Sequence, residues 1–400
     1  MQRTNDLRPS PGSQAPLQRR NFLRAATAIG FAGPAVLAPS GAAQQQGALS
    51  GSATASRRLQ AVDEINNKAR QALDPICRGC KQCDGVACAG EYPGLGGIGS
   101  GVSFQNNFLA LKRLQLKLRT LTNVATVEKK PDTSVTIFGQ KLSFPAIAAP
   151  VGGLANVGNR MAPDKYFDAI IGGCVDAGTA GAIGDEPTAP DALKIRYDVI
   201  ARYEGRAFAC IKPRPNPNYL SVLPMAEASG AFMVGIDVDS AARYGGARAE
   251  TQVGTKTPAQ LRELIRASKR PLVVKGIMTP EEALAAVEAG APGIVVSNHG
   301  GRVLDHTPGT AEVLPAIADA VKGKTVIFVD GCVHYGVDVL KYLALGADAV
   351  LVGRHLVKAA FGGGREGVAL YMRTMRDELE AAMVMTGVPS VDKVSRRILV

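Results

Sequence analysis

A histidine and an arginine stand together after one apolar run, at a spacing that suits acid–base chemistry on an acidic substrate. The run Gly293–Val296 is followed by Ser-Asn-His-Gly-Gly-Arg, which contains His299 and Arg302. A histidine accepts a proton near neutral pH, and an arginine holds a carboxylate through two parallel hydrogen bonds. The pair therefore indicates an acid substrate that loses a proton. A short His-x-x-Arg by itself is more often a loop histidine beside a surface charge, so the surrounding elements must decide.

The chain alternates short β-branched runs with stretches of helical periodicity, several of which begin at Pro or Thr. Nearly continuous apolar strands in such an alternation predict a parallel sheet. Eight strand–helix units over roughly 220 residues predict one α/β domain, a (β/α)8 or TIM barrel. The predicted strands are Phe144–Ala149, Ala180–Ile183, Phe208–Ile211, Phe232–Asp237, Leu272–Lys275, Gly293–Ser297, Thr325–Asp330 and Ala349–Val352. The clearest helical stretches are Pro258–Ser268, Pro280–Ala289 and Gly336–Leu345.

Four residues with useful side chains lie at the ends of these predicted strands. Lys275, His299, Asp330 and Arg354 end or follow strands five to eight. The active site of a (β/α)8 barrel lies where the strands end. A surface-charge explanation does not predict this alignment, so these residues become candidates for one site.

These motifs resemble the FMN-dependent α-hydroxy acid dehydrogenase/oxidase family, which includes glycolate and lactate oxidases and flavocytochrome-type lactate dehydrogenases. The resemblance runs from about Tyr92 to the C-terminus. It is carried by Val274-Lys275-Gly276, Ser297-Asn298-His299-Gly300-Gly301-Arg302, Asp330-Gly331 and Val352-Gly353-Arg354.

The resemblance implies a catalytic role for each matching residue. His299 would be the base that accepts the substrate's proton, and Arg302 would bind the substrate carboxylate. Asp237 would orient His299 and stabilise its protonated form, and Tyr92 would bind substrate. Lys275 would face the N1/C2 carbonyl edge of the flavin, where its charge stabilises the reduced anionic ring.

The resemblance also implies an FMN site. A glycine after a barrel strand lets backbone N–H groups approach phosphate oxygens while an arginine adds charge, as Gly331, Gly353 and Arg354 would do. Ser297 and Asp330 belong to the same predicted cofactor site.

Four positions depart from the family pattern. His334 replaces an arginine that helps to hold the FMN phosphate, and it would carry charge only when protonated. Val151 and Gly152 leave a smaller residue beside the expected flavin N5. Ile211-Lys212-Pro213 stands in place of a tyrosine that contacts substrate, so we expect a polar contact to be lost. A second substrate arginine has two candidates, Arg243 and Arg248.

The expected function is FMN-dependent oxidation of a 2-hydroxy acid to a 2-oxo acid. The electron acceptor is open between oxygen and a respiratory carrier, such as an acceptor protein, a quinone or an iron–sulfur centre. Two alternatives remain: a non-redox isomerase of the type 2 isopentenyl diphosphate isomerase kind, and a catalytically silent exported carrier of flavin or metal. Residues 297–302 argue against the isomerase.

Four of the seven cysteines lie within twelve residues, as Cys77, Cys80, Cys83 and Cys88. Thiolates at this spacing can surround zinc or a four-iron iron–sulfur cluster. The first three are spaced as in bacterial ferredoxins, whereas the fourth comes one residue late and lacks a following proline. Two disulfides in an exported protein, or free thiols, are the alternatives.

The N-terminus resembles a twin-arginine export signal. Arg19 and Arg20 precede the weakly apolar run Ala25–Ala38 and a small-residue cleavage region that ends near Ala43. We therefore expect residues 1–43 to be a signal peptide read by the twin-arginine export machinery and the mature protein to be periplasmic. Residues 44–91 would form a helix and the cysteine-rich segment, and residues 92–400 the FMN-binding barrel.

Composition limits the partners. The formal net charge is +11, and residues 1–43 hold five arginines and one aspartate, so the rest carries +7. No basic tract with interleaved aromatics indicates nucleic acid, and residues 44–400 contain no apolar run long enough to span a membrane. Family members often form tetramers, so the resemblance implies a homo-oligomer. We also expect a helix over Ser56–Leu73, and a turn over Phe361–Gly367 before a helix over Val368–Met385.

Overall fold

The fold was analysed in a computed structural model, which describes residues 59–400 except 92–93, 127–128, 153, 186–189 and 243–252. The predicted signal peptide, Tyr92, Arg243 and Arg248 lie outside the described residues and stay predictions. In the described part, residues 59–73 form a helix, as expected for that segment. None of the described helices is long and apolar enough to cross a membrane.

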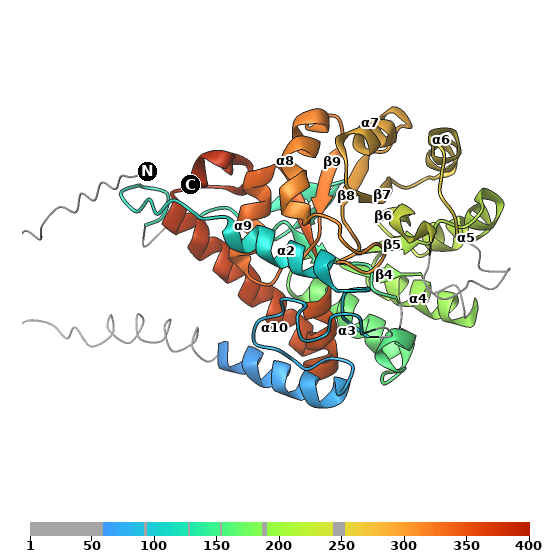
Figure 1. The fold of residues 1–400 in the computed structure, drawn as a ribbon, viewed down its shortest axis with the longest axis horizontal. Coiled ribbons are helices and arrows are strands. Elements are labelled where there is room, and N and C mark those ends of the chain that lie inside the picture. Colours follow the sequence, from blue (N-terminus) through green and yellow to red (C-terminus); the bar gives the residue numbers. More distant parts are fainter. Residues whose placement is uncertain (1–58, 92–93, 127–128, 153, 186–189, 243–252) are drawn as a thin grey trace, which may run out of the picture. The chain divides into compact units, whose positions relative to one another are not determined.

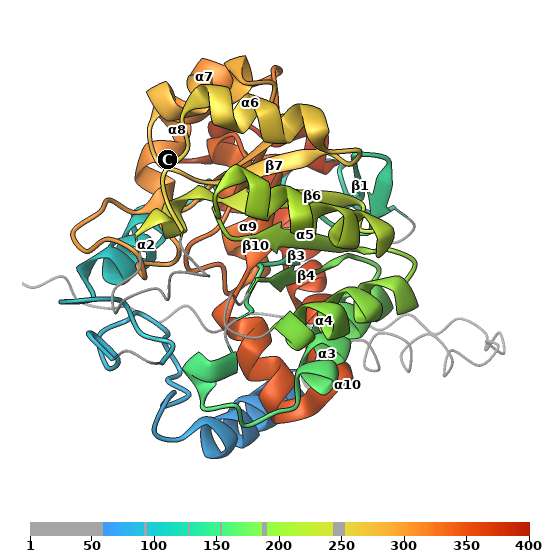
Figure 2. The ribbon, with the colours of Figure 1, turned by 90° about the vertical axis from the view of Figure 1, so that its right-hand side faces the viewer.

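Eight parallel strands form the centre of the molecule, and helices surround them (Figures 1 and 2). Along the sheet the order is β3, β10, β9, β8, β7, β6, β5, β4. The backbone N–H of Ala148 in β3 donates to the carbonyl of Ala180 beside β4 at 3.1 Å, which brings the two edges together. The predicted TIM barrel is confirmed. Its strands are β3 (Ala146–Ala148), β4 (Gly181–Gly184), β5 (Ala207–Ile211), β6 (Met233–Asp237), β7 (Leu272–Ile277), β8 (Gly293–Val296), β9 (Val326–Val329) and β10 (Ala349–Val352).

The helices begin where the sequence signals place them. Thr257 and Thr279 accept hydrogen bonds from the third backbone N–H of α6 and α7, and a proline opens each helix. The helices are α2 (Val102–Arg113), α3 (Pro163–Asp176), α4 (Pro190–Arg202), α5 (Asn216–Ala228), α6 (Pro258–Ala267), α7 (Pro280–Glu288), α8 (Thr310–Val321), α9 (Gly336–Leu345) and α10 (Arg354–Thr386). Short 3-10 turns are η1 (Leu154–Val157), η2 (Val238–Ala241), η4 (Val391–Lys393) and η5 (Arg396–Ile398).

A hairpin of β1 (Val135–Ile137) and β2 (Gln140–Leu142) covers the end of the barrel opposite the predicted site. Its turn residue Phe138 packs against Phe328 of β9, with ring centroids 6.4 Å apart. A Cβ added to Gly293, the first residue of β8, would lie 3.1 Å from the Phe138 ring. The N-terminal ends of the strands are therefore closed by packing, and the opposite end is left for chemistry.

The glycine-rich run near the C-terminus interrupts α10. A turn was expected over Phe361–Gly367, and within this run the backbone leaves the helical conformation at Gly364, where φ is 58° and ψ is −148°, so that two helical segments meet there. A Cβ on Gly362 would lie 2.0 Å from the Ile65 carbonyl in the helix over residues 59–73. The glycines therefore permit close packing of two helices, which lie side by side in Figure 1.

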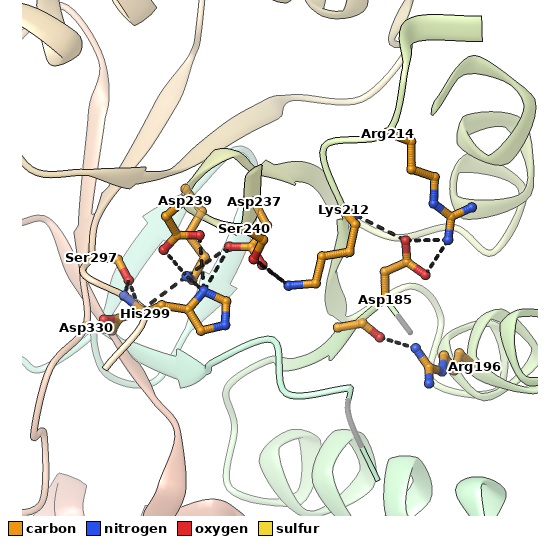
Figure 3. Close-up of polar contacts among 12 residues, drawn as sticks. Asp185, Arg196, Lys212, Arg214, Asp237, Asp239, Ser240, Ser297, His299 and Asp330 are labelled. Atoms are coloured by element: carbon orange, nitrogen blue, oxygen red, sulfur yellow. Dashed lines mark hydrogen bonds and ion pairs between the residues drawn. The ribbon is translucent and has the colours of Figure 1, made fainter. Parts of the chain in front are cut away.

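A buried arginine joins the two strands at which the barrel closes. Arg196 of α4 is 1% exposed, and its guanidinium donates to the carbonyls of Gly184 (2.5 Å) and Gly152 (3.1 Å), as Figure 3 shows for one of these bonds. Gly152 follows β3 and Gly184 ends β4. A Cβ on Gly152 would lie 2.3 Å from the Gly184 carbonyl oxygen, so the two backbones touch here. Arg196 thus fixes the backbone that forms one wall of the predicted site.

We predict that Arg196→Met lowers the free energy of unfolding by about 2–4 kcal/mol, because it leaves two buried carbonyls without their charged donor. Urea denaturation followed by circular dichroism measures the change. Arg202→Met on the same helix is the control, since the Arg202 side chain is 54% exposed and its pair with Asp168 is 3.8 Å long. Equal stability of the two variants would contradict the role given to Arg196.

Candidate active site

One cavity at the C-terminal ends of the strands gathers most of the predicted site residues. Ser297 lies just behind its wall: its Oγ accepts the His299 backbone N–H (3.0 Å) and donates to Asp330 (2.7 Å). The predicted residues that line the cavity are Val151, Gly152, Asp237, Lys275, His299, Arg302, Asp330, Gly331, Gly353 and Arg354.

Lys275 lies at the centre of a polar cluster in this cavity. Its Nζ is 3.1 Å from Asp237 Oδ1, 3.3 Å from Asp239 Oδ2 and 3.4 Å from His299 Nδ1. The Lys275 side chain is only 4% exposed, and Asp330 lies 4.0 Å away. Figure 3 shows that Asp237, Asp239 and His299 point toward one another from neighbouring strand ends.

The histidine is held by two carboxylates through one ring nitrogen. His299 Nδ1 lies 3.1 Å from Asp239 Oδ1 and 3.5 Å from Asp237 Oδ1. Asp237 is the predicted partner, but Asp239 is the nearer one. Because Nδ1 is occupied by these groups, Nε2 is the atom left for proton transfer with a molecule in the cavity.

The charges in this cluster shift one another's pKa. Burial alone would raise the pKa of Asp237, but the ammonium groups of Lys212 and Lys275 hold it well below its usual value. Burial and the neighbouring Asp237 charge raise the pKa of Asp239. Burial opposes the charged form of Lys275, yet the two carboxylates raise its pKa well above the ordinary value. The lysine therefore stays charged although it is buried.

The backbone after β8 is strained where it presents the histidine. His299, Gly300 and Gly301 have φ values of 57°, 62° and 77°, a left-handed run that is costly for a residue with a Cβ. A Cβ on Gly300 would lie 2.6 Å from Arg354 Nη1, and one on Gly301 would lie 2.4 Å from the Phe104 nitrogen. The two glycines are therefore required both by φ and by close neighbours.

Two arginines tie the loop before α2 to the cavity. Arg302 Nη1 donates to the carbonyls of Gly94 (2.7 Å) and Gly96 (2.9 Å). Arg354 donates to the carbonyls of Leu95 (2.6 Å) and Gly300 (2.7 Å). The predicted carboxylate-binding and phosphate-binding arginines thus also position the segment that covers the site.

Lys212 brings a charge to the cavity at the position where the sequence lacks the family's tyrosine. It lines the cavity, forms an ion pair with Asp237 and donates to Ser240 Oγ at 2.7 Å, while the expected loss of a contact with substrate stays a prediction. The residue behind it is also charged: Asp185 pairs with Arg214 at 2.7 Å and accepts the Lys212 backbone N–H at 3.1 Å. Sequence reasoning missed Asp185, Lys212, Asp239 and Ser240. Each follows a predicted strand, which is the signal that could have found them.

His334 lies outside the cavity lining. Its ring stacks between Tyr335 and His355, at centroid distances of 3.9 Å and 3.8 Å. Burial and, second, the nearby charge of Lys358 lower the pKa of His334 to about 3. This low pKa favours an uncharged ring at neutral pH, in contrast to the arginine of the family pattern.

The chain is similar in sequence to known proteins. The family model described as FMN-dependent dehydrogenase matches residues 94–182 and 191–400. An L-lactate oxidase of Lysinibacillus sphaericus (strain C3-41) is 31% identical over 329 residues, which are 74% of this chain and 84% of that protein. An L-lactate dehydrogenase of Xanthomonas campestris pv. campestris (strain B100) is 52% identical over 125 residues, which are 31% of this chain and 32% of that protein.

A solved structure of a mandelate oxidase mutant with a C4a-OH-FMN adduct superposes with a TM-score of 0.66 and 28% sequence identity. The similarity covers 84% of this chain and 97% of that one. The matched family region contains His299, Arg302, Lys275 and both aspartates that hold the histidine. The chain therefore belongs to the FMN-dependent dehydrogenase family, as the sequence motifs indicated.

Proposed function

We propose that this protein oxidises a 2-hydroxy acid to a 2-oxo acid with FMN as the immediate electron acceptor. The observation that carries the proposal is one cavity in which His299 is held by two carboxylates while Arg302 lies in the same wall. A base beside a carboxylate-binding arginine suits removal of a proton from a small hydroxy acid. The related L-lactate oxidase and mandelate oxidase are consistent with this substrate class.

The residues present fit FMN. Apolar side chains that suit a flat ring line the cavity beside the donors, including Leu95, Val151 and Leu154. Gly331, Gly353 and Arg354 stand after β9 and β10, where they would hold the phosphate. Asp330 Oδ1 is buried and has no hydrogen-bond partner among the described residues, so it could accept a bond from a ribityl hydroxyl. Bound there, FMN supplies a two-electron acceptor that no amino-acid side chain provides.

The protein's own residues would handle the proton and the carboxylate. His299 Nε2 would accept the proton, and Asp239 and Asp237 would stabilise the resulting imidazolium through Nδ1. Arg302 would hold the carboxylate, with its own position fixed by the Gly94 and Gly96 carbonyls. Lys275 would place its buried positive charge beside the ring as negative charge develops there. Oxygen and a respiratory carrier remain the two kinds of final acceptor.

The two other interpretations fit less well. The relatives reported above are oxidases and a dehydrogenase, which favours net redox chemistry over isomerisation. A protein that only carries flavin or metal would not require His299, Asp237, Lys275 and Arg302 together in one cavity.

The proposal extends to location and assembly. Residues 1–43 would direct export by the twin-arginine machinery, so the enzyme would act in the periplasm as a homo-oligomer. Arg19, Arg20 and the small residues up to Ala43 support the export route, and this route suits a protein that binds FMN before export. The family resemblance supports the assembly.

His299→Gln should keep FMN but lower the rate of anaerobic flavin reduction by about 10²–10⁴-fold, because the proton acceptor is lost. Stopped-flow absorbance measures the rate, with L-lactate as the first probe from a panel of 2-hydroxy acids. His306→Gln is the matched control, since His306 lies in the same loop with φ 60° but its side chain is 74% exposed. Reduction of the His299→Gln flavin at the native rate would refute the role of His299.

Gly300→Ala should weaken FMN binding about tenfold, or ~1.4 kcal/mol. The new Cβ would displace the Arg354 guanidinium from its place in the cavity wall. Gly139→Ala is the control: its φ of 80° imposes a similar backbone cost, but a Cβ there meets nothing within 4 Å. Equilibrium dialysis of FMN distinguishes the two, and equal affinities would show that Arg354 is not needed where it stands.

Lys212→Met should move the acid limb of the flavin-reduction rate to higher pH. Burial favours protonated Asp237 and the Lys212 charge opposes it, so removal of that charge raises the pKa of Asp237. Asp237 would then take up a proton at a higher pH and no longer stabilise protonated His299. Stopped-flow rates across the pH range test this, with exposed Lys194→Met as the control. An unshifted acid limb in Lys212→Met would contradict the argument.

A further inference from the structure

The four clustered cysteines surround a second, smaller cavity. Cys77, Cys80, Cys83 and Cys88 all line it, although they belong to an irregular segment between the helix over residues 59–73 and α2. All four are free thiols and half-buried. The fold therefore brings the four cysteines of the sequence motif to the lining of one cavity.

The distances between the cysteine sulfurs bear on whether the site suits zinc or a four-iron cluster. A four-thiolate zinc site has Zn–S distances near 2.3 Å, so its sulfurs lie about 3.8 Å apart. Among the described residues, the only group of three or more possible metal ligands within 4.8 Å of one another is Asp237, Asp239 and His299. No three of the cysteine sulfurs are that close. A four-iron cluster binds each thiolate through a different iron atom, so its four sulfurs need not lie as close together as those of a zinc site.

A buried positive charge points to an anionic occupant. Lys358 of α10 is 3% exposed and lines the cysteine cavity. Lys358 therefore adds a positive charge to the lining of this cavity, and a largely buried positive charge favours an anionic occupant. Four thiolates bound to an iron–sulfur core would supply negative charge, whereas two disulfides would not.

The cysteine cavity shares a wall with the cavity proposed for FMN. Cys83, Leu95, Phe104 and Arg354 line both. The Arg354 guanidinium lies 3.8 Å from the centroid of the Phe104 ring. One layer of side chains therefore separates the two cavities, a short path for electrons.

We propose that Cys77, Cys80, Cys83 and Cys88 bind a four-iron iron–sulfur cluster that takes electrons from reduced FMN. The electron source rests on the proposed function. Oxidation of one 2-hydroxy acid delivers two electrons to the flavin and releases two protons. The cluster passes these electrons one at a time to a haem or iron–sulfur protein, so two acceptor molecules are reduced and the cluster returns to its oxidised state.

The test starts with the full chain purified anaerobically with its FMN. We expect about four iron and four acid-labile sulfide per chain, and an electron paramagnetic resonance signal after dithionite reduction. Cys80→Ser should lose iron, sulfide and signal while its FMN is still reduced by a 2-hydroxy acid. Cys174→Ala is the control, because Cys174 is buried in α3 and lines neither cavity. Zinc instead of iron, or thiols paired as disulfides, would overturn the assignment.

A second measurement tests the electron path separately. A 2-hydroxy acid added anaerobically to the wild type should produce the signal of the reduced cluster. Reduced flavin beside a cluster that stays oxidised would refute the electron path. A protein that contains the cluster but whose flavin no 2-hydroxy acid reduces would refute the proposed function without refuting the cluster.

Lys358→Met keeps all four thiols but removes a positive charge beside the cluster. We therefore expect it to lower the reduction potential of the cluster. An unchanged potential would contradict the role of Lys358 as the counter-charge.

Discussion

The buried ammonium of Lys275 is the interaction on which the site depends. It is the register partner of Asp237 on the neighbouring strand, so the pairing of β6 with β7 places the two charges side by side. Asp239 and His299 then converge on it from η2 and from the loop after β8. A charge buried this deeply is tolerated only when it is paired. The cluster therefore requires the parallel register of the barrel, and a shift of one residue would turn Lys275 away from the cavity.

The strained backbone at His299 depends in turn on packing against α2. Asn298 Oδ1 accepts bonds from Asn107 of α2 (2.8 Å) and from the Gly301 backbone N–H (3.1 Å). The carbonyl of Gly301 accepts the Ile98 N–H at 2.8 Å. These bonds hold a left-handed run that would otherwise relax. They also explain why α2 and the loop before it are part of the site although they lie far from His299 in the sequence. These residues make the contacts that hold the backbone around His299 in place.

The barrel and most of the site could be predicted because strand periodicity and strand-end residues are local signals. Lys275, His299 and Asp330 were found in this way. Asp239 and Lys212 were missed because the family pattern drew attention to Asp237 and to a lost tyrosine, whereas their roles come from side chains that meet in space. The interruption of α10 at Gly364 was expected, but the packing of the neighbouring glycines on Ile65 was not, because Ile65 is almost three hundred residues earlier. His334 stands where the family pattern has an arginine, but its burial, with its ring stacked between His355 and Tyr335, lowers its pKa, which the sequence does not show.

The start of α10 links the two proposed cofactors. Arg354 and Lys358 are one helical turn apart at its N-terminus, so their side chains lie on the same face. The N-terminus of a helix carries partial positive charge and favours anions. An FMN phosphate and four iron-bound thiolates are both anionic, and Arg354 lines both cavities. The same helix end would thus neutralise both groups. Arg354, which packs on the Phe104 ring, would lie between the two proposed cofactors.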